Sequence, residues 1–422
     1  MEQEDKRVSA YRIAIGAVAI LALLLSCALA VLLYKFYEGR YETVVSESFQ
    51  DGSTYSGQVR RGRRVGFGVA AYPDGRRYEG FWKEDIFCGK GTLSYPDGLS
   101  YEGVWVDGRL EDAEISSEEF HYSGAVKFMP DSVRVIPDGF GRMVYNITGE
   151  VYVGNWKDGN RHSLGRLFRP DGTYSFGRWS SGSLVVPSGK SFADGDRVYG
   201  VDISHHQKHI SWDILALYCN ASGTVYSGKA KSYTYARPVD FVYMKATEGE
   251  SHKDTKYLEY VQNARTHYIP KGAYHFFKEN VGAAAQMRNF FSVAVFDRGD
   301  MPPALDVELD PKVAKNYGEK RLRDSILVCL KMMEEHFGVR PIIYTGDRAR
   351  SSYMDDDCFA GYDFWLARYG KEPQNEKYRM WQFSQGGQMS GLKREYDIDL
   401  DEFMGTYRSF RNYIYTHQKT RY

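Results

Sequence analysis

The chain has 422 residues with 55 basic and 55 acidic side chains, and a formal net charge of zero argues against a nucleic-acid partner, which normally requires a basic excess. Apolar residues make up 43% and charged residues 26%, so the composition excludes wholesale disorder, and the length predicts two or three domains. The five dispersed cysteines (Cys27, Cys88, Cys219, Cys329 and Cys358) have no metal-ligand spacing, which predicts mostly free thiols and no zinc site.

The first predicted element is a membrane-spanning helix over residues 13–34. These 22 residues carry no charge and are rich in Leu, Ala, Ile and Val, and about 20 such residues span a bilayer. The basic flanking residues are Lys6, Arg7 and Arg12 before the segment and Lys35 and Arg40 after it. The larger number of basic residues before the segment than after it predicts that residues 1–36 form a cytoplasmic tail and single-pass anchor. Everything after them would then lie on the periplasmic or cell-wall side.

Processing of this segment and a buried soluble helix are the alternatives to an uncleaved anchor. Residues 24–27 (Leu-Leu-Ser-Cys) resemble a lipoprotein cleavage box, and residues 28–30 (Ala-Leu-Ala) resemble a signal-peptidase site. Both are followed by the apolar residues 31–34, where a mature N-terminus should turn polar. The sequence therefore favours the uncleaved anchor.

A repeat region with a period of 23 residues is predicted over residues 49–182. The recurring positions are Asp51-Gly52, Asp74-Gly75 and Asp97-Gly98, then Tyr55, Tyr78 and Tyr101, then Trp82 and Trp105. After an irregular stretch the frame returns at Tyr152, Gly154 and Trp156, and again at Gly177 and Trp179. Each unit predicts a β-hairpin, because Asp-Gly favours a tight turn and Tyr-x-Gly-x-Trp alternates with the period of a strand.

Glycines placed opposite large rings allow successive hairpins to stack into an elongated sheet. The pattern resembles the MORN repeat, in about six copies, of which the first two are the most regular. This resemblance implies either a protein or lipid partner for the repeats or a spacer role, and most of the Tyr and Trp side chains are expected to be stacking core.

A barrel of alternating strands and helices is predicted for residues 198–410. The predicted strands are 200–204, 241–246, 272–277, 304–308, 341–345, 364–369 and 380–384, with helical patterns at 255–267, 282–295 and 319–337. This alternation predicts a parallel sheet, and the number of strands predicts a (β/α) barrel. In such barrels the chemistry lies at the carboxyl ends of the strands.

Polar residues stand at those strand ends. They include Asp202 and Ser204, Lys245, Thr247 and Glu248, Tyr274 and His275, Asp306 and Glu308, Tyr344, Arg368 and Tyr369, Gln382, and finally Asp397 and Asp399. Several carboxylates together with Tyr, His, Trp and Gln are the composition of a sugar-binding cleft.

Asp306 and Glu308 are the most informative pair, because residues i and i+2 of a strand face the same side. Two carboxylates in one site cannot both ionise freely, so one pKa rises and that group can act as a general acid. Glycosidic cleavage requires this arrangement, although Asp-x-Glu taken alone also fits ordinary surface carboxylates.

A set of motifs in chain order resembles the glycoside hydrolase family 25 lysozymes over about residues 198–410. The motifs are Gly200-Val201-Asp202-Ile203-Ser204, Lys245-Ala246-Thr247-Glu248-Gly249, Gly272-Ala273-Tyr274-His275-Phe276, Pro303-Ala304-Leu305-Asp306-Val307-Glu308, Pro341-Ile342-Ile343-Tyr344-Thr345, Trp365-Leu366-Ala367-Arg368-Tyr369, Trp381-Gln382-Phe383 and Ile398-Asp399-Leu400-Asp401-Glu402-Phe403. The resemblance implies an irregular (β/α) barrel that hydrolyses the β-1,4 bond between N-acetylmuramic acid and N-acetylglucosamine in peptidoglycan, with no cofactor and no metal.

The resemblance also implies roles for individual residues. Glu308 would be the general acid and later the base, and Asp306 would orient or stabilise a cyclised intermediate formed by the substrate's acetamido group. Asp202 and Asp399 would complete the catalytic carboxylates. The expected substrate-binding residues are Tyr274, Tyr344, Lys245, Glu248, Trp365, Tyr369 and Gln382.

Two features depart from the family pattern. Asp401 stands where the family usually has Asn, which adds a carboxyl group near Asp399. Residues 213–240, between Trp212 and Phe241, include a polar Tyr- and Ser-rich stretch that looks like an insertion. Either could change the substrate fit or the pH optimum, but neither removes a catalytic carboxylate.

The sequence thus predicts a membrane-anchored muramidase. The alternatives are a scaffold with an inactive barrel that binds peptidoglycan or a protein partner, and a glycosidase acting on another acetamido glycan. His205, His206 and His209 could suggest a metal site, but clustered surface histidines explain them better.

Overall fold

The computed structural model describes residues 29, 43–129, 134–185, 191–192, 197–229, 235–309, 315–374 and 377–416. The chain divides into two compact units, residues 1–118 with 128–135 and residues 119–127 with 136–422. The predicted domain limits at 49, 182, 198 and 410 stay a prediction. Among the described residues, no helix is both long and apolar enough to cross a bilayer, and the predicted helix over 13–34 lies outside them except for Leu29.

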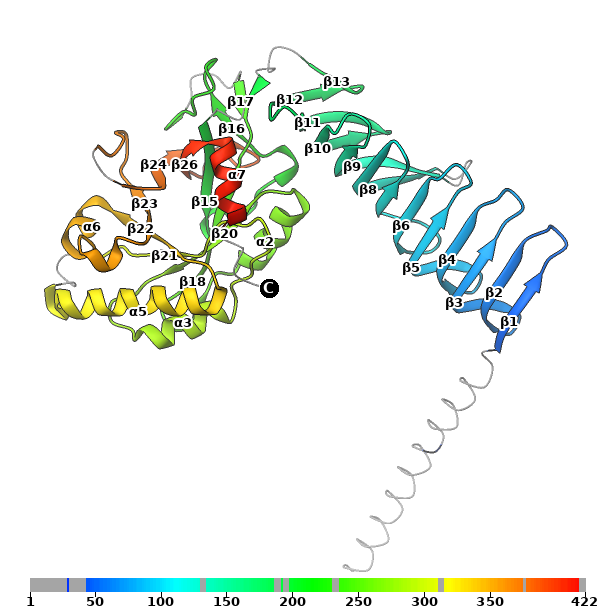
Figure 1. The fold of residues 1–422 in the computed structure, drawn as a ribbon, viewed down its shortest axis with the longest axis horizontal. Helices are drawn as coiled ribbons and strands as arrows, with labels where there is room; N and C mark the ends of the chain where they lie inside the picture. Colours follow the sequence, from blue (N-terminus) through cyan, green and yellow to red (C-terminus); the bar gives the residue numbers. More distant parts are fainter. Residues whose placement is uncertain are drawn as a thin grey trace, which may run out of the picture. The chain divides into compact units, whose positions relative to one another are not determined.

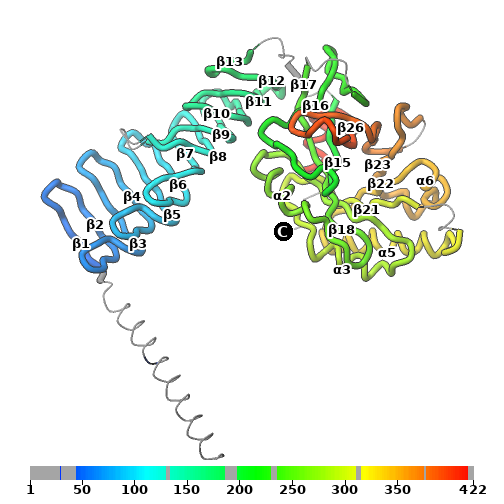
Figure 2. Tube along the Cα trace, turned by 180° about the vertical axis from the view of Figure 1, so that it is seen from behind, coloured from blue at the N-terminus to red at the C-terminus, as the bar shows by residue number. Residues whose placement is uncertain are grey.

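Antiparallel strands form the first unit, as the repeats predict. They are β1 (Thr43–Ser48), β2 (Thr54–Arg60), β3 (Arg63–Ala71), β4 (Arg77–Lys83), β5 (Ile86–Ser94), β6 (Ser100–Trp105) and β7 (Asp112–Ser116). Each pairs with the next along the chain, and Figure 2 shows these strands side by side in sequence order. Gly52, Gly75 and Gly98 of the Asp-Gly turns have φ values of 85°, 83° and 82°, a conformation that favours glycine.

The repeated Tyr, Trp and Gly residues form the core of the sheet by direct contact. The Tyr78 hydroxyl donates to the Phe81 carbonyl at 3.0 Å, and the Trp105 indole donates to the Gly91 carbonyl at 3.0 Å. A Cβ on Gly91 would lie 2.3 Å from the Tyr78 hydroxyl, so no larger residue fits beneath the ring. The predicted stacking of rings on glycine is confirmed.

Trp105→Ala should therefore destabilise the first unit by about 3–5 kcal/mol, the usual cost of truncating a buried large aromatic side chain. Trp105 is 1% exposed and also makes an edge contact with Tyr78, at 5.7 Å between ring centroids. Chemical denaturation of the full chain measures the loss. The neighbouring Val104→Ala is the control because Val104 is 57% exposed, and equal effects of the two substitutions would contradict this packing.

The later repeats keep the same pattern in the second unit. Their strands are β8 (Phe120–Met129) and β9 (Arg134–Tyr145), both of which begin or end in the first unit, then β10 (Val151–Lys157), β11 (Asn160–Phe168), β12 (Tyr174–Ser180), β13 (Ser183–Leu184) and β14 (Ser191–Phe192). The Tyr152 hydroxyl donates to the Asn155 carbonyl at 3.1 Å, and the Trp179 indole donates to the Gly165 carbonyl at 3.1 Å.

Eight strands close into a barrel in the remainder of the second unit. In barrel order they are β15 (Arg197–Ile203), β26 (Ile398–Thr406), β24 (Met380–Gly387), β23 (Asp363–Ala367), β22 (Ile342–Gly346), β21 (Ala304–Asp306), β20 (Lys271–Phe276) and β18 (Phe241–Glu248), and the β15–β18 pairing closes the ring. The short β19 (His252–Lys253) extends β18.

The barrel sheet is mixed and not parallel throughout as predicted, because β26, which was not among the predicted strands, runs antiparallel to both β24 and β15. Only residues 388–397 connect β24 to β26, and a parallel neighbour would need a longer crossover, usually with a helix. Within residues 213–240, β16 (Ala216–Cys219) pairs with β17 (Tyr235–Arg237), and both join β25 (Met389–Ser390) from the connection between β24 and β26 in a small separate sheet.

Three helices lie at the predicted positions, namely α2 (Tyr257–Thr266), α3 (Ala283–Phe291) and α5 (Glu319–Phe337). Two more helices, α6 (Asp347–Tyr353) and α7 (Tyr407–Thr416), and the short 3-10 turns η1 (His205–Gln207), η2 (Trp212–Ile214) and η3 (Asp357–Phe359) were not predicted. Helices α3 and α5 lie side by side on the outside of the barrel (Figure 1).

Apolar side chains cover the outer face of the barrel sheet and also fill the interior of the barrel. One cluster packs the outer face against the helices, and the other fills the interior with residues such as Tyr243, Trp365 and Phe403. Phe410 of α7 packs on Phe241, the first residue of β18, so α7 covers the amino ends of the strands. An active site is therefore expected at the carboxyl ends of the strands, which α7 does not cover.

Arg166 of repeat strand β11 forms a buried ion pair with Asp240, which immediately precedes β18. The guanidinium lies 2.9 Å from Asp240 Oδ1, and Asp240 Oδ2 accepts the backbone N–H of Tyr199 in β15 at 3.1 Å. The Asp240 side chain is fully buried. Repeat strand β11 therefore supplies the positive charge that balances the buried carboxylate of Asp240 beside barrel strand β18.

Arg166→Met should destabilise the second unit by about 3–5 kcal/mol, because it leaves the Asp240 carboxylate buried without its cation. Adding Asp240→Asn should recover part of that loss, as a double-mutant cycle of unfolding free energies measures. Arg178→Met, at an exposed position of β12, is the matched control. Additive effects of Arg166→Met and Asp240→Asn would contradict the pairing.

Candidate active site

A cleft of about 280 Å³ lies at the carboxyl ends of the barrel strands; we call it the acidic cleft. The residues that line it are Asp202, Ile203, Ser204, His206, Gln207, Lys245, Tyr274, Phe276, Asp306, Glu308, Tyr344, Trp365, Tyr369, Gln382, Gln385 and Asp399. Every residue predicted as catalytic or substrate-binding is in this set except Glu248. Four carboxyl groups from three strands are thereby brought together.

Strand register explains why these side chains meet. In the parallel part of the barrel, Asp306 lies beside Phe276 of β20 and Tyr344 of β22. In the antiparallel part, Asp202 of β15 lies opposite Asp399 of β26. Residues distant in sequence therefore occupy the same level of the barrel wall.

Asp306 and Glu308 differ in environment although they are two residues apart. Asp306 is buried, its Oδ1 has no hydrogen-bond partner among the described residues, and burial together with the nearby Glu308 raises its pKa well above the usual range. Glu308 faces solvent at the cleft, but the surrounding protein excludes enough water to raise its pKa, against the opposing effect of Lys245 and Lys278. Glu308 is thus the solvent-accessible carboxyl of the pair, and Asp306 is the buried one.

Asp399 completes this group of titratable carboxyls. Burial, followed by the charges of Glu308 and Asp397, raises the pKa of Asp399 to about 6. The acidic cleft therefore retains protons at mildly acidic pH, where isolated carboxyl groups would be ionised.

A chain of hydrogen bonds centred on Gln382 fixes the polar side chains on one wall of the acidic cleft. Tyr344 and Tyr369 donate their hydroxyls to Gln382 Oε1 at 2.9 and 3.1 Å, and Gln382 Nε2 donates to Asp202 Oδ2 at 2.7 Å. Asp202 thereby determines which way the Gln382 amide points. The two tyrosines, predicted to contact sugar, are held in place through it.

Glu248 lies outside the acidic cleft, in a neighbouring groove, where it is bound by two lysines. Its carboxylate is 2.6 Å from Lys245 Nζ and 2.8 Å from Lys278 Nζ. Burial opposes ionisation, but the hydrogen bonds from both lysines lower the pKa of Glu248 to about 2. Both ammonium groups also lie over the Phe276 ring, at 4.7 and 4.6 Å from its centroid. Glu248 thus fixes the cations near Glu308.

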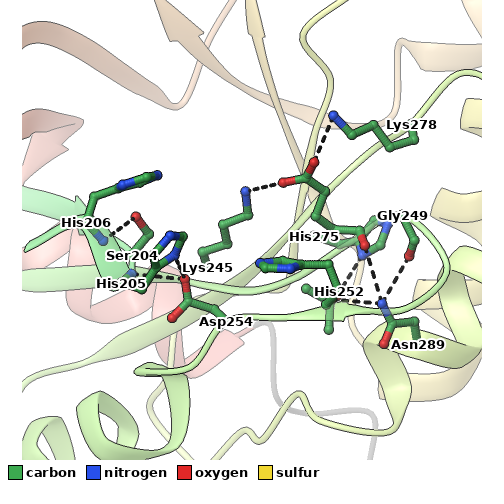
Figure 3. A network of polar contacts seen from close by, with 12 residues as sticks. Ser204, His205, His206, Lys245, Gly249, His252, Asp254, His275, Lys278 and Asn289 are labelled. Atoms are coloured by element: carbon green, nitrogen blue, oxygen red, sulfur yellow. Dashed lines mark hydrogen bonds and ion pairs between the residues drawn. The ribbon is translucent and has the colours of Figure 1, made fainter. Parts of the chain in front are cut away.

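The histidines are engaged with protein groups. His205 Nδ1 lies 2.7 Å from the buried carboxylate of Asp254 (Figure 3). His275 Nδ1 lies 2.7 Å from the Thr247 hydroxyl. Burial lowers the pKa of His275 to about 4, so it is neutral at physiological pH. Within the described ranges, no three His, Cys, Asp or Glu side chains are grouped so as to hold a metal ion.

Sequence reasoning missed part of the lining of the acidic cleft. His206, Gln207 and Gln385 line it without having been assigned a role there, and Lys278 was overlooked beside it. Each lies within a few residues of a recognised strand end. They would have been found if the residues just after each predicted strand had also been considered as site candidates.

Comparison with known proteins places the two regions in families. Residues 201–392 match the Glycosyl hydrolases family 25, and residues 55–76, 78–100 and 152–174 each match the MORN repeat. YegX of Escherichia coli, an uncharacterized protein, is 31% identical over 220 residues, which cover 51% of this chain and 73% of YegX. Lysozyme M1 of Streptomyces globisporus is 24% identical over 234 residues, covering 51% of this chain and 70% of that lysozyme.

Among solved structures, a bacterial lysozyme from Streptomyces coelicolor is 26% identical, with a TM-score of 0.41 over 53% of this chain and 99% of the lysozyme. Both resemblances identified from the sequence are confirmed at the level of the family. Three repeat copies are matched where about six were expected.

Proposed function

The chain belongs to the glycosyl hydrolases family 25, and we propose that its barrel is a muramidase that hydrolyses the β-1,4 bond between N-acetylmuramic acid and N-acetylglucosamine in peptidoglycan. The observation that carries this proposal is the different environment of Asp306 and Glu308 in one cleft. A solvent-facing carboxyl with a raised pKa can deliver a proton, and a buried carboxyl with an unpartnered oxygen can receive a hydrogen bond from the substrate.

Glu308 protonates the glycosidic oxygen as the bond to the departing sugar breaks. The acetamido oxygen of the substrate attacks the anomeric carbon and closes a ring, and Asp306 Oδ1 accepts the acetamido N–H and balances the positive charge that develops. Glu308, now ionised, removes a proton from the water that opens the ring, which returns both carboxyls to their starting states.

Digestion of purified peptidoglycan by the full-length protein tests this function, with mass spectrometry of the reducing ends. A muramidase leaves N-acetylmuramic acid at every new reducing end. Chitin oligosaccharides should be run in parallel, because equal rates on both substrates would favour a general acetamido glycosidase. Binding to peptidoglycan without any new reducing ends would favour the inactive scaffold.

We also propose that residues 13–34 anchor the protein in a membrane with the barrel outside the cytoplasm, on the basis of their 22 uncharged residues. Deleting residues 1–36 should then move the protein from the membrane fraction to the soluble fraction, while the rate on soluble glycan fragments stays within about twofold. Full-length protein that is cleaved by protease only from the cytoplasmic side of spheroplasts would contradict this topology.

A further inference from the structure

Asp401 lies one level below the acidic cleft, inside the barrel. It follows Asp399 by two residues in β26, so both side chains face the interior, and it lies opposite Gly200 of β15 and Gln382 of β24. Asp401 is completely buried. Neither the catalytic steps nor the substrate contacts above give it a role.

The two oxygens of Asp401 have different surroundings. Oδ1 accepts the indole N–H of Trp365 at 2.8 Å. Oδ2 is buried and has no hydrogen-bond partner among the described residues. Asp202 is the diagonal neighbour of Asp401, because Asp202 pairs with Asp399 and Gly200 pairs with Asp401 in the register of β15 with β26. Two carboxyl groups can share a hydrogen bond only when one of them carries a proton, because an ionised carboxylate is an acceptor alone.

The charges around the pair favour keeping that proton. Burial raises the pKa of both Asp202 and Asp401 well above the usual range, and the carboxylate of Asp399 raises both further. The titratable groups that face the pair include Asp399 on β26, Tyr243 on β18, Tyr274 on β20, Asp306 on β21, Tyr344 on β22 and Tyr369 after β23, and the neutral Trp365 and Gln382 bind its oxygens. No ion pair with a lysine, arginine or histidine is formed by either carboxyl in the described part of the chain.

We propose that Asp401 is a positioning residue that shares one proton with Asp202 and thereby holds the Asp202 carboxyl in place in the wall of the acidic cleft. The consequence for catalysis, which rests on the proposed function, passes through Gln382 to the hydroxyls of Tyr344 and Tyr369. When the proton is lost at high pH, two adjacent buried carboxylates repel and this wall of the cleft is displaced. Asn, the residue expected here from the family, would bind Asp202 through an amide N–H that does not titrate.

Asp401→Asn tests the shared proton directly, because its amide can donate to Asp202 at any pH. In the wild type, ionisation of Glu308 and loss of the shared proton both lower kcat/KM on the alkaline side, so the fall should steepen from about tenfold to about 100-fold per pH unit. In Asp401→Asn only the ionisation of Glu308 remains, so the fall should stay at about tenfold per pH unit, with kcat/KM at the acid optimum within about threefold of wild type. Asp401→Leu, which can bind neither Asp202 nor Trp365, should lose activity at every pH, and Asp355→Asn at an exposed carboxyl should leave the profile unchanged.

The pH dependence of unfolding provides a readout that does not need activity. Carboxyls with a raised pKa bind more protons in the folded than in the unfolded state, so the unfolding free energy falls as pH rises from the ordinary Asp value of 3.8 through the raised one. Asp401→Asn removes one such group and should flatten this fall, whereas Asp355→Asn should not. If the unfolding free energy of Asp401→Asn falls less steeply with pH than that of wild type, but the wild-type protein does not cleave peptidoglycan, the result would support the shared proton and reject the muramidase. Unfolding and activity profiles of Asp401→Asn that both superimpose on wild type would overturn the proposal.

Discussion

Glu308→Gln is expected to reduce peptidoglycan hydrolysis by about 10²-fold or more while leaving the unfolding free energy nearly unchanged. Glutamine has the shape of glutamate but cannot deliver a proton to the leaving oxygen, and loss of a positioned acid typically costs about 10²–10⁴ in rate. The side chain faces solvent at the cleft, so its replacement by an isostere disturbs little packing. Release of new reducing ends from purified peptidoglycan measures the rate.

The matched control for this substitution is Glu335→Gln, which makes the same chemical change at an exposed position of α5. Activity of Glu308→Gln within a few-fold of wild type would remove Glu308 from the mechanism.

Asp306→Asn should also reduce turnover by about 10²-fold or more, for a different reason. It removes the negative charge that balances the positive centre in the transition state, an effect typically of about 10²–10³ in kcat. Because burial raises the pKa of Asp306, its ionised form is costly in the folded protein, and the neutral amide should stabilise the fold at pH 7 while it impairs catalysis. Separate measurement of kcat, KM and the unfolding midpoint distinguishes these effects.

Asp324→Asn, on the exposed side of α5, serves as the control for a general loss of carboxylate. If Asp306→Asn kept kcat and raised only KM, Asp306 would be a substrate clamp, and the assignment of a charge-balancing role would be wrong.

The repeat architecture was predictable because its structure is local. A period of 23 residues places Tyr, Trp and Gly at fixed positions in each hairpin, and the contacts of Tyr78 with Gly91 and of Trp105 with the Gly91 carbonyl lie within or between adjacent hairpins. The contact of Arg166 with Asp240 could not be predicted, because its residues are 74 apart and neither belongs to a recurring pattern.

The cleft was predictable from strand ends, and its electrostatics were not. Placing carboxyls at the ends of barrel strands brought Asp202, Asp306 and Asp399 to one site. Which charges pair there depends on side-chain reach between strands, and so the sequence did not reveal that Glu248 is bound by two lysines. Strand β26 was not among the predicted strands, because the rule of alternation expects a helix between successive strands and only residues 388–397 connect β24 to β26.

The measurement that tests the account most directly is the identity of the reducing ends produced when the full-length protein digests purified peptidoglycan, with Glu308→Gln as the paired inactive variant. The account predicts that wild type produces reducing-end N-acetylmuramic acid and that Glu308→Gln produces about 10²-fold less. Reducing-end N-acetylglucosamine, or the same products at the same rate from the variant, would contradict it.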